Sequence, residues 1–455
     1  MKTKDRVGDI FDIEITDLAY NGKAIGLLDG KVVFLNGGLP GEKVRAEITR
    51  TKARFSTGRV LNIIDKSAER IKAPCIHYDI CGGCTWQDLD YSKQLYYKRK
   101  QVVDCLEHIG KFEDVRVAET IGSGERFYYR NKMEFSFNTA EDGRFNLGLH
   151  QRGHYDEIFD VDKCLLESEL SNDIVAWFRD FVRENRIPVY DVEKHTGFMR
   201  FLAIRQSKNT DQVMVNIVTT DGPIPNADKL IETARDRFPQ IKTIVQNTNN
   251  QKSNIARGEK ETILFGEGYI EEKLLRYTFR IYANSFFQTN TRQTETLYRA
   301  AFDLLRPDSA DHLLDLYCGA GTIGICISDC VAGVTGIELE PSAIQAAREN
   351  ADINNVENID FHAGNMRSVL KEKRGILEDF TCAIIDPPRA GMHPKALSRL
   401  IELDLPRIVY ISCNPATFSR DAAELVASGY EISQVVPVDM FPHTMHIELA
   451  AGFYK

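Results

Sequence analysis

The chain has 455 residues, more than the roughly 100–200 residues of one typical domain, so we expect about two to four domains. It contains no run near the roughly 18 apolar residues that a membrane span needs, and its first residues lead into no apolar signal segment, which predicts a cytoplasmic protein without membrane contact. The net charge of −9 argues against indiscriminate coating of nucleic acid, because such binding depends on neutralising many phosphates.

Residues 1–62 have the pattern of a small closed β-barrel of the oligonucleotide-binding kind. Short apolar runs are separated by turns rich in glycine, asparagine and proline, as in the run from Asn36 to Gly41. The predicted strands cover residues 9–15, 22–27, 31–34, 42–49 and 58–64. We interpret this segment as an RNA-binding barrel.

Three of the ten cysteines, Cys75, Cys81 and Cys84, lie close together in a C-x5-C-G-G-C pattern. Between this pattern and the C-terminal third the chain has two more, Cys105 and Cys164. Without an export signal, clustered cysteines are more often metal ligands or free thiols than a disulfide framework. Three close thiols with a distant fourth suit a [4Fe–4S] cluster or a zinc ion, and His77 could complete a mixed zinc site.

Residues 63–280 read as a central α+β domain that carries this cysteine cluster. An amphipathic helix is predicted at 93–110, where it could instead pack on the domain that follows, and a second helix at 168–185 lies among short strands. The stretch 126–132 interleaves aromatic residues with cations, and Phe286 and Phe287 follow later. Arg130, Lys132 and Phe287 are therefore candidate RNA contacts; core packing and a surface ion-pair face are the alternatives.

From residue 281 to 455 the chain alternates strand, glycine turn and helix, which predicts a Rossmann-like parallel sheet covered by helices. The strand predicted at 312–318 leads into the turn that begins at Gly319. Glu338 ends the next strand, 19 residues after Gly319, where an acid can bind ribose hydroxyls. This pattern is typical of a nucleoside cofactor site.

Asp315, Asn365 and Asp386 follow or end further strands of the same predicted sheet, and Asp386 opens the run Asp-Pro-Pro-Arg. Because ligands bind at the carboxyl ends of the strands in open α/β sheets, these side chains should converge on one site. The set favours S-adenosylmethionine over a nicotinamide dinucleotide.

Cys413 follows a buried strand in the run Ser-Cys-Asn-Pro, at the edge where the cofactor would lie, which suits a nucleophile. Glu448 lies in an otherwise apolar strand predicted at 447–453, where burial should raise its pKa. One thiol and one base are what methylation of uracil C5 demands: the thiolate adds to C6, and the base later removes the C5 proton. His443 and His446 are alternative bases.

These motifs together resemble the RNA 5-methyluridine methyltransferase family. The resemblance rests on the following runs: Phe287-Gln288-Thr289-Asn290, Asp315-Leu316-Tyr317-Cys318-Gly319, Asp386-Pro387-Pro388-Arg389, Ser412-Cys413-Asn414-Pro415 and His446-Ile447-Glu448. It implies that Cys413 is the nucleophile and Glu448 the base. It also implies cofactor contacts by Gln288, Tyr317, Glu338 and Asp386, with Asn365 in a position similar to a further contact.

The resemblance also bears on the substrate. It implies a TRAM domain at the N-terminus and favours an iron–sulfur cluster on Cys75, Cys81, Cys84 and Cys164, a combination similar to the branch that modifies 23S ribosomal RNA, where some relatives methylate two uridines. We therefore expect a monomeric 23S ribosomal RNA (uracil-C5)-methyltransferase. A transfer RNA methyltransferase and a non-catalytic RNA-binding factor on the same fold are the alternatives.

Overall fold

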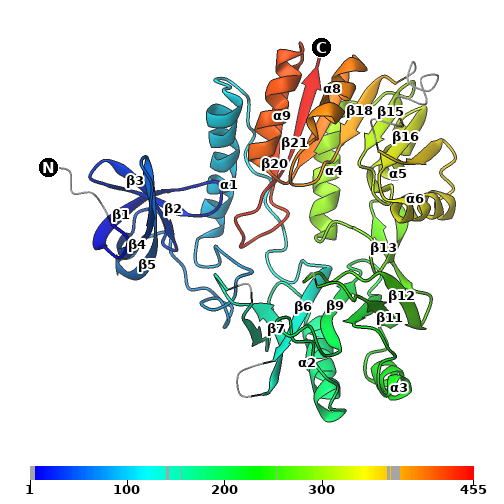
Figure 1. Ribbon diagram of the computed structural model, residues 1–455. Helices are drawn as coiled ribbons and strands as arrows, with labels where there is room; N and C mark the ends of the chain where they lie inside the picture. Colours follow the sequence, from blue (N-terminus) through cyan, green and yellow to red (C-terminus); the bar gives the residue numbers. More distant parts are fainter. Residues whose placement is uncertain (1–5, 140–142, 155, 253, 366–368, 370–379) are drawn as a thin grey trace.

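The computed structural model describes residues 6–139, 143–154, 156–252, 254–365, 369 and 380–455. It contains a closed barrel, two seven-stranded sheets and a two-stranded hairpin, which Figure 1 shows with the barrel at the N-terminal end and the two sheets in separate layers. No helix in these ranges is long and apolar enough to cross a membrane.

The predicted N-terminal barrel is confirmed. Its strands are β1 (Ile10–Leu18), β2 (Ala24–Leu28), β3 (Lys31–Asn36), β4 (Lys43–Thr51) and β5 (Phe55–Asp65), and they close in the order β1-β2-β3-β5-β4. Alternate residues of β1 point inward, so that Ile13 and Ile15 are buried while Glu14 is exposed. At Gly58 the strands approach so closely that a Cβ atom would lie 2.4 Å from the carbonyl oxygen of Glu47.

The central domain is a mixed sheet with two helices packed on it. The strands lie in the order β12-β11-β10-β9-β6-β7-β8. Their bounds are β6 (Lys132–Thr139), β7 (Phe145–His150), β8 (Ile158–Asp160), β9 (Met199–Gln206), β10 (Val213–Thr219), β11 (Ile241–Thr248) and β12 (Lys260–Phe265); the helices are α2 (Glu169–Glu184) and α3 (Ala227–Arg237). Helix α2 begins where the sequence predicts, because the Ser168 hydroxyl accepts a hydrogen bond from the Ser171 amide at 3.0 Å.

Helix α1 (Tyr91–Cys105), continued by a π-helical turn η1 (Leu106–Gly110), lies between the barrel and the C-terminal sheet (Figure 1). Tyr97 packs into the barrel core, whereas Val102 belongs to the core of the C-terminal domain. The following segment, residues 117–121, then pairs with the edge of that domain's sheet at Val435 and Val438. This helix therefore does pack on the C-terminal domain, because its two faces are apolar toward different partners.

The C-terminal domain has the predicted Rossmann-like sheet, in the order β17-β16-β15-β18-β19-β21-β20, in which only β21 runs antiparallel to its neighbours. The strands are β15 (His312–Leu316), β16 (Gly333–Glu338), β17 (Ile359–Ala363), β18 (Cys382–Ile385), β19 (Arg407–Ser412), β20 (Glu431–Val438) and β21 (Glu448–Tyr454). The helices with described bounds are α4 (Thr291–Leu305), α5 (Thr322–Ile327), α6 (Pro341–Ile353), α8 (Pro394–Glu402) and α9 (Pro415–Ala427), with a short 3-10 turn η2 (Ser328–Cys330).

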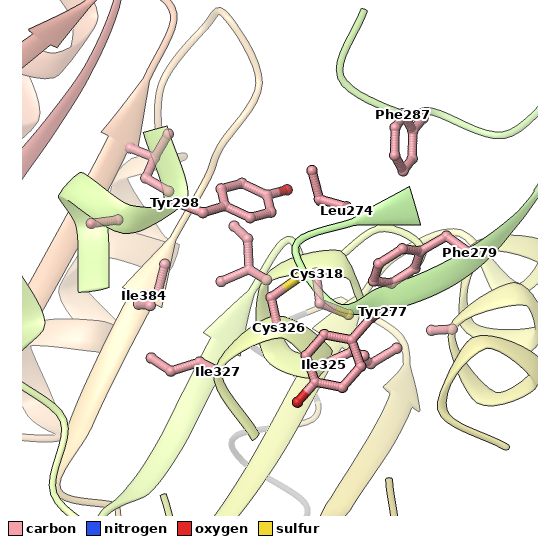
Figure 2. Close-up of a cluster of buried hydrophobic side chains, with 14 of the residues drawn as sticks. Leu274, Tyr277, Phe279, Phe287, Tyr298, Cys318, Ile325, Cys326, Ile327 and Ile384 are labelled. Atoms are coloured by element: carbon pink, nitrogen blue, oxygen red, sulfur yellow. The ribbon is translucent and has the colours of Figure 1, made fainter. Parts of the chain in front are cut away.

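The hairpin of β13 (Tyr269–Leu274) and β14 (Tyr277–Tyr282) begins before residue 281, where we predicted the domain to start, yet it packs into the core of that domain. Figure 2 shows Leu274 and Phe279 of this hairpin beside Cys318 and Ile325. The core of the C-terminal domain therefore extends upstream of the predicted boundary, and through the same cluster the hairpin also meets Met214 and Val245 of the central sheet.

Candidate active site

The turn after β15 is shaped for a ligand at the carboxyl edge of the sheet. Tyr317 and Gly319 both adopt positive φ angles, 64° and 54°, and a Cβ atom added at Gly319 would meet nothing within 4 Å. At Gly321, in contrast, a Cβ would lie 2.6 Å from the ring of Phe361, so only glycine fits there. Open space beside Gly319 is what the approach of a cofactor to the backbone requires.

Glu338 ends β16 next to this turn, as predicted. Its Oε2 accepts a hydrogen bond from the Gly319 amide at 3.3 Å, and its Oε1 accepts one from the Glu340 amide at 3.0 Å. These two contacts fix the carboxylate at the strand end, where it can accept further hydrogen bonds from ribose hydroxyls. Asn365 follows β17, and the neighbouring Gly364 amide donates to the Glu338 carbonyl at 2.8 Å, so Asn365 lies beside Glu338 on an exposed stretch.

Asp315 and Asp386 bring two buried or partly buried carboxyl groups to the same edge. Burial raises the pKa of each to about 7, and each side chain has one stabilising donor: the Gly324 amide for Asp315, at 3.0 Å, and the Gln288 side chain for Asp386. Asp315 Oδ1 has no partner. An acidic, partly desolvated strand edge of this kind favours a cationic ligand, because a positive charge would restore the ionised carboxylates.

Cys413 and Glu448 lie on adjacent strand ends. Strand β19 pairs with β21 so that Ser412 is opposite Leu449, and the register continued by one residue places Cys413 opposite Glu448. Side chains directly opposite each other on antiparallel strands have Cβ atoms roughly 4.5–5.5 Å apart. The predicted nucleophile and the predicted base are therefore cross-strand neighbours.

The electrostatics of this pair are those of an enclosed acidic site. Burial first, and then the charges of Glu448 and Asp386, raise the pKa of the Cys413 thiol to about 12. Burial and Asp386 likewise raise the pKa of Glu448, whose side chain is 4% exposed. The guanidinium of Arg389 acts in the opposite direction on both groups and lowers their pKa values.

The two histidines considered as alternative bases are poorly suited to that role. Burial lowers the pKa of both His443 and His446 to about 4, which makes each imidazole a weak base at neutral pH. His443 is also held in a structural network: its ring stacks on Phe127 with centroids 4.3 Å apart, and Nδ1 lies 3.3 Å from the amide nitrogen of Gln94. This geometry favours Glu448 as the base.

Sequence reasoning missed two groups near the nucleophile. Arg389 ends the run Asp-Pro-Pro-Arg, but the sequence suggested no role for it. In the structure its positive charge lowers the pKa of both Cys413 and Glu448. Tyr20 comes from the barrel, and its hydroxyl donates to Asn414 Oδ1 at 2.6 Å. The acidic residues predicted at the neighbouring strand ends were the signal that could have indicated this electrostatic role of Arg389. No local signal marks Tyr20, because it meets Asn414 only through the docking of two domains.

All four clustered cysteines line one cavity of about 770 Å³ in the central domain. Burial raises the pKa of Cys84 to about 11. The thiols are near one another, since Cys81 and Cys75 add to that rise and Cys84 adds to the raised pKa of Cys164. Across the described ranges, no three His, Cys, Asp or Glu side chains are arranged to hold a single metal ion. His77 Nε2 instead accepts a hydrogen bond from the Asp162 amide at 3.1 Å, so the mixed zinc site finds no support.

The predicted RNA contacts lie in different surroundings. Phe287 is 4% exposed and packs in the core (Figure 2), so its ring offers no surface for a base to stack on, whereas Phe286 is 71% exposed. Lys132 pairs with Glu134 at 2.7 Å and is partly buried. Arg130 lines the cysteine cavity. The prediction of Phe287 as an RNA contact therefore needs correction, because its ring packs in the core, whereas Phe286 is exposed.

Comparison with known proteins finds similarity along almost the whole chain. The family model described as tRNA (Uracil-5-)-methyltransferase matches residues 90–454, and a TRAM domain model matches residues 4–61. An uncharacterized RNA methyltransferase of Halalkalibacterium halodurans is 38% identical over 445 residues, 97% of this chain and 96% of the relative. One of Chlorobaculum tepidum is 38% identical over 470 residues, 99% and 97% of the two chains.

A solved structure is similar over almost the full length. The tRNA (uracil-54, C5)-methyltransferase of Pyrococcus abyssi, in complex with S-adenosyl-L-homocysteine, has a TM-score of 0.78 and 32% identity, and the match covers 97% of this chain and 100% of that one. A match of this extent must include most of the N-terminal barrel. The barrel by itself therefore does not separate ribosomal RNA enzymes from transfer RNA enzymes. This differs from our expectation that the barrel and the cysteine cluster together indicate the ribosomal RNA branch.

Proposed function

Because the chain belongs to the family of S-adenosylmethionine-dependent RNA (uracil-5-)-methyltransferases, we propose that it methylates C5 of a uridine with Cys413 as nucleophile and Glu448 as base. Two observations support this assignment: the register of β19 and β21 ends with Ser412 opposite Leu449, one residue short of the pair, and the charge of Glu448 acts on the Cys413 thiol.

The first step is addition of the Cys413 thiolate to C6 of the uracil. This forms a carbon–sulfur bond and moves the electron pair of the C5–C6 double bond to C5, which becomes nucleophilic. Arg389 supports this step because its charge lowers the pKa of the thiol, against the raising effect of burial and of Glu448. S-adenosylmethionine, when bound, supplies an electrophilic methyl group on a sulfonium.

The second task belongs to Glu448. After C5 carries the methyl group, Glu448 accepts the proton from C5, the double bond reforms, and the sulfur of Cys413 leaves C6. A buried carboxylate with a raised pKa is a stronger base than an ordinary one, and its burial beside β19 keeps water away from the adduct.

We assign the cofactor site to the carboxyl edge of β15, β16 and β18. The adenosine part would meet Glu338, through its ribose, and the open backbone at Gly319, while Asp386, Gln288 and Tyr317 face the same edge. Asn365 is a further candidate beside Glu338. The acidic character of this edge is the feature that supports binding of a sulfonium cation.

We propose that Cys75, Cys81, Cys84 and Cys164 hold a [4Fe–4S] cluster. Four cysteine thiols are the usual ligands of such a cluster, and here all four line one cavity. The expected signature is iron and acid-labile sulfide in stoichiometric amounts in protein purified without oxygen, with loss of both in Cys84→Ser.

The proposed substrate is 23S ribosomal RNA, supported by the cysteine set; transfer RNA is the second candidate, favoured by the similarity to the Pyrococcus abyssi enzyme. In either RNA the target must be unstacked, since C5 and C6 are hidden in a helix. Phe286, with its exposed ring, is placed to stack on a base, and Lys132 and Arg130 are the proposed cationic contacts.

The test is transfer of labelled methyl groups to 23S ribosomal RNA and to transfer RNA transcripts, with the product nucleosides separated by mass. We expect 5-methyluridine, no product with Cys413→Ala, and a protein–RNA adduct that accumulates with Glu448→Gln. Cys330→Ala, which removes an exposed cysteine, is the matched control and should retain activity. Full activity of Cys413→Ala would disprove the covalent mechanism.

A further inference from the structure

The N-terminal barrel is fixed against the C-terminal domain through helix α1. On the barrel side, Trp86, Leu89 and Tyr97 are part of the barrel's hydrophobic core, and Lys100 pairs with Asp17 at 2.8 Å. On its other side α1 packs against the C-terminal domain, where Val102 is fully buried. The barrel is therefore held in one position relative to the catalytic strands, as in Figure 1.

One loop of the barrel reaches the strand ends that carry Cys413 and Glu448. We define the barrel loop as residues 19–23, between β1 and β2, a tight turn closed by a hydrogen bond from the Ala19 amide to the Lys23 carbonyl at 2.8 Å. Within it, a Cβ atom added at Gly22 would lie 3.0 Å from Cβ and Sδ of Met445. Met445 is three residues before Glu448, and it packs on the barrel core.

The second contact of the barrel loop is with the residue next to the nucleophile. The Tyr20 hydroxyl donates to Asn414 Oδ1 at 2.6 Å. Asn414 is also the N-cap of α9, because the same oxygen accepts from the Ala416 amide at 3.0 Å, and its Nδ2 donates to the Arg389 carbonyl at 2.9 Å. The side-chain amide of Asn414 therefore bonds to three parts of the protein: Tyr20 of the barrel, the first turn of helix α9 and the backbone of Arg389.

We propose that Tyr20 is a positioning residue of the methyl-transfer reaction: through Asn414 it holds the backbone that presents Cys413 to the uracil. The barrel then contributes to catalysis as well as to RNA binding. This inference rests on the proposed function, because positioning a nucleophile matters only if Cys413 is one.

The geometry favours this role over a simple RNA contact. Tyr20 is 37% exposed and its hydroxyl is engaged by Asn414; burial, followed by Cys105 and Cys413, raises the pKa of Tyr20, so the group remains a neutral donor. A donor of this kind can orient Asn414, and a hydroxyl proton already donated to Asn414 is not available to a phosphate. Small displacements of a reacting atom, on the order of 1 Å, are costly in rate.

The test is Tyr20→Phe, which removes the hydroxyl and keeps the ring. Thr49→Val is the matched control, because it removes a hydroxyl from the same barrel that bonds only to Thr57. We expect kcat to fall roughly tenfold in Tyr20→Phe, with KM for RNA and the Kd of RNA binding changed by less than about twofold. Thr49→Val should match the wild type in all three values.

A second measurement isolates the covalent step. In the Glu448→Gln background, which should trap the adduct, adding Tyr20→Phe is expected to slow adduct formation by roughly the same factor as kcat. An unchanged kcat, or a raised Kd with an intact kcat, would overturn the positioning role. If Glu448→Gln alone yields no adduct, the failure lies in the proposed function and not in Tyr20.

Discussion

At the scale of single residues, the reactivity of Cys413 is controlled by the charges around it. Burial, Glu448 and Asp386 raise the pKa of its thiol to about 12, so the thiolate is the minor form at neutral pH. Only the thiolate attacks, and its fraction grows tenfold per pH unit below the pKa. In the free protein the thiol of Cys413, the proposed nucleophile, should therefore react weakly, and nearby positive charge should activate it.

The first prediction concerns this pH dependence. We expect alkylation of Cys413 by iodoacetamide, followed by mass spectrometry of its peptide, to accelerate steadily with pH up to about 10. Arg389→Ala should slow alkylation at every pH, since loss of the cation raises the thiol pKa further. Arg399→Ala, on the exposed end of α8, is the control. If the alkylation rate reached a plateau below about pH 8, the pKa of the Cys413 thiol would not be raised as we expect.

The second prediction uses the two opposite effects of Asp386. Asp386→Asn removes a charge that raises the pKa of Cys413 and of Glu448, so alkylation of Cys413 should become faster. The same change removes the carboxylate that accepts from Gln288 at the proposed cofactor site, so S-adenosylmethionine should bind about 10- to 100-fold more weakly. Calorimetry measures the affinity for S-adenosylmethionine. Slower alkylation of Cys413 in Asp386→Asn would contradict the expected effect on the pKa of the thiol.

At the scale of secondary structure elements, helix α1 fixes the segment that leads to Glu448. Lys98 of α1 and Asp439 form an ion pair with both side chains fully buried, and Lys98 Nζ also donates to the Phe441 carbonyl at 3.0 Å. Gln94, one turn earlier, accepts from the His443 amide at 2.9 Å. The backbone between β20 and β21 is therefore held by a helix from the other end of the chain.

The third prediction tests this pair. Lys98→Met leaves the Asp439 carboxylate buried without its cation and should lower the free energy of unfolding by about 3–5 kcal/mol. The double variant Lys98→Met/Asp439→Leu should recover much of that loss, because no uncompensated charge remains. Lys194→Met, which breaks an exposed pair with Asp191, should change the melting temperature little. Equal losses in the single and double variants would refute this account.

At the scale of the whole molecule, two distant parts of the chain meet at the segment before Glu448. The amides of Thr85 and Trp86, directly after Cys84, both donate to the His443 carbonyl at 3.0 Å, while the barrel loop contacts Met445. The cysteine cavity and the barrel are thus connected to the proposed base by short stretches of backbone.

The fourth prediction follows from that connection. Cys81→Ser should abolish the iron content and, because the loop 81–86 loses its anchor, lower kcat for methyl transfer more than the affinity for S-adenosylmethionine. Cys330→Ser, at an exposed cysteine of the C-terminal domain, is the control for iron and for activity. Iron analysis beside steady-state kinetics checks both, and wild-type kcat in iron-free Cys81→Ser would exclude the connection.

What the sequence determined by itself is mostly local. Alternating apolar residues predicted the barrel and the strands, and the glycine turn predicted the edge at which Glu338 and Gly319 meet. Cys413 and Glu448 could be singled out because each carries a reactive group at the end of an apolar strand. For the strands that run parallel, local periodicity and spacing suffice, since their carboxyl ends converge at one edge of the sheet; the antiparallel β21, which begins at Glu448, is not covered by that rule.

Only the tertiary structure decided which distant segments share a surface. The placement of Phe287 in the core, the two-sided packing of α1 and the contact of Tyr20 with Asn414 depend on how separate domains dock. Docking is set by the shape and polarity of whole surfaces, which a run of neighbouring residues does not encode. For the same reason the register that brings Cys413 beside Glu448 emerged only when β21 paired with β19.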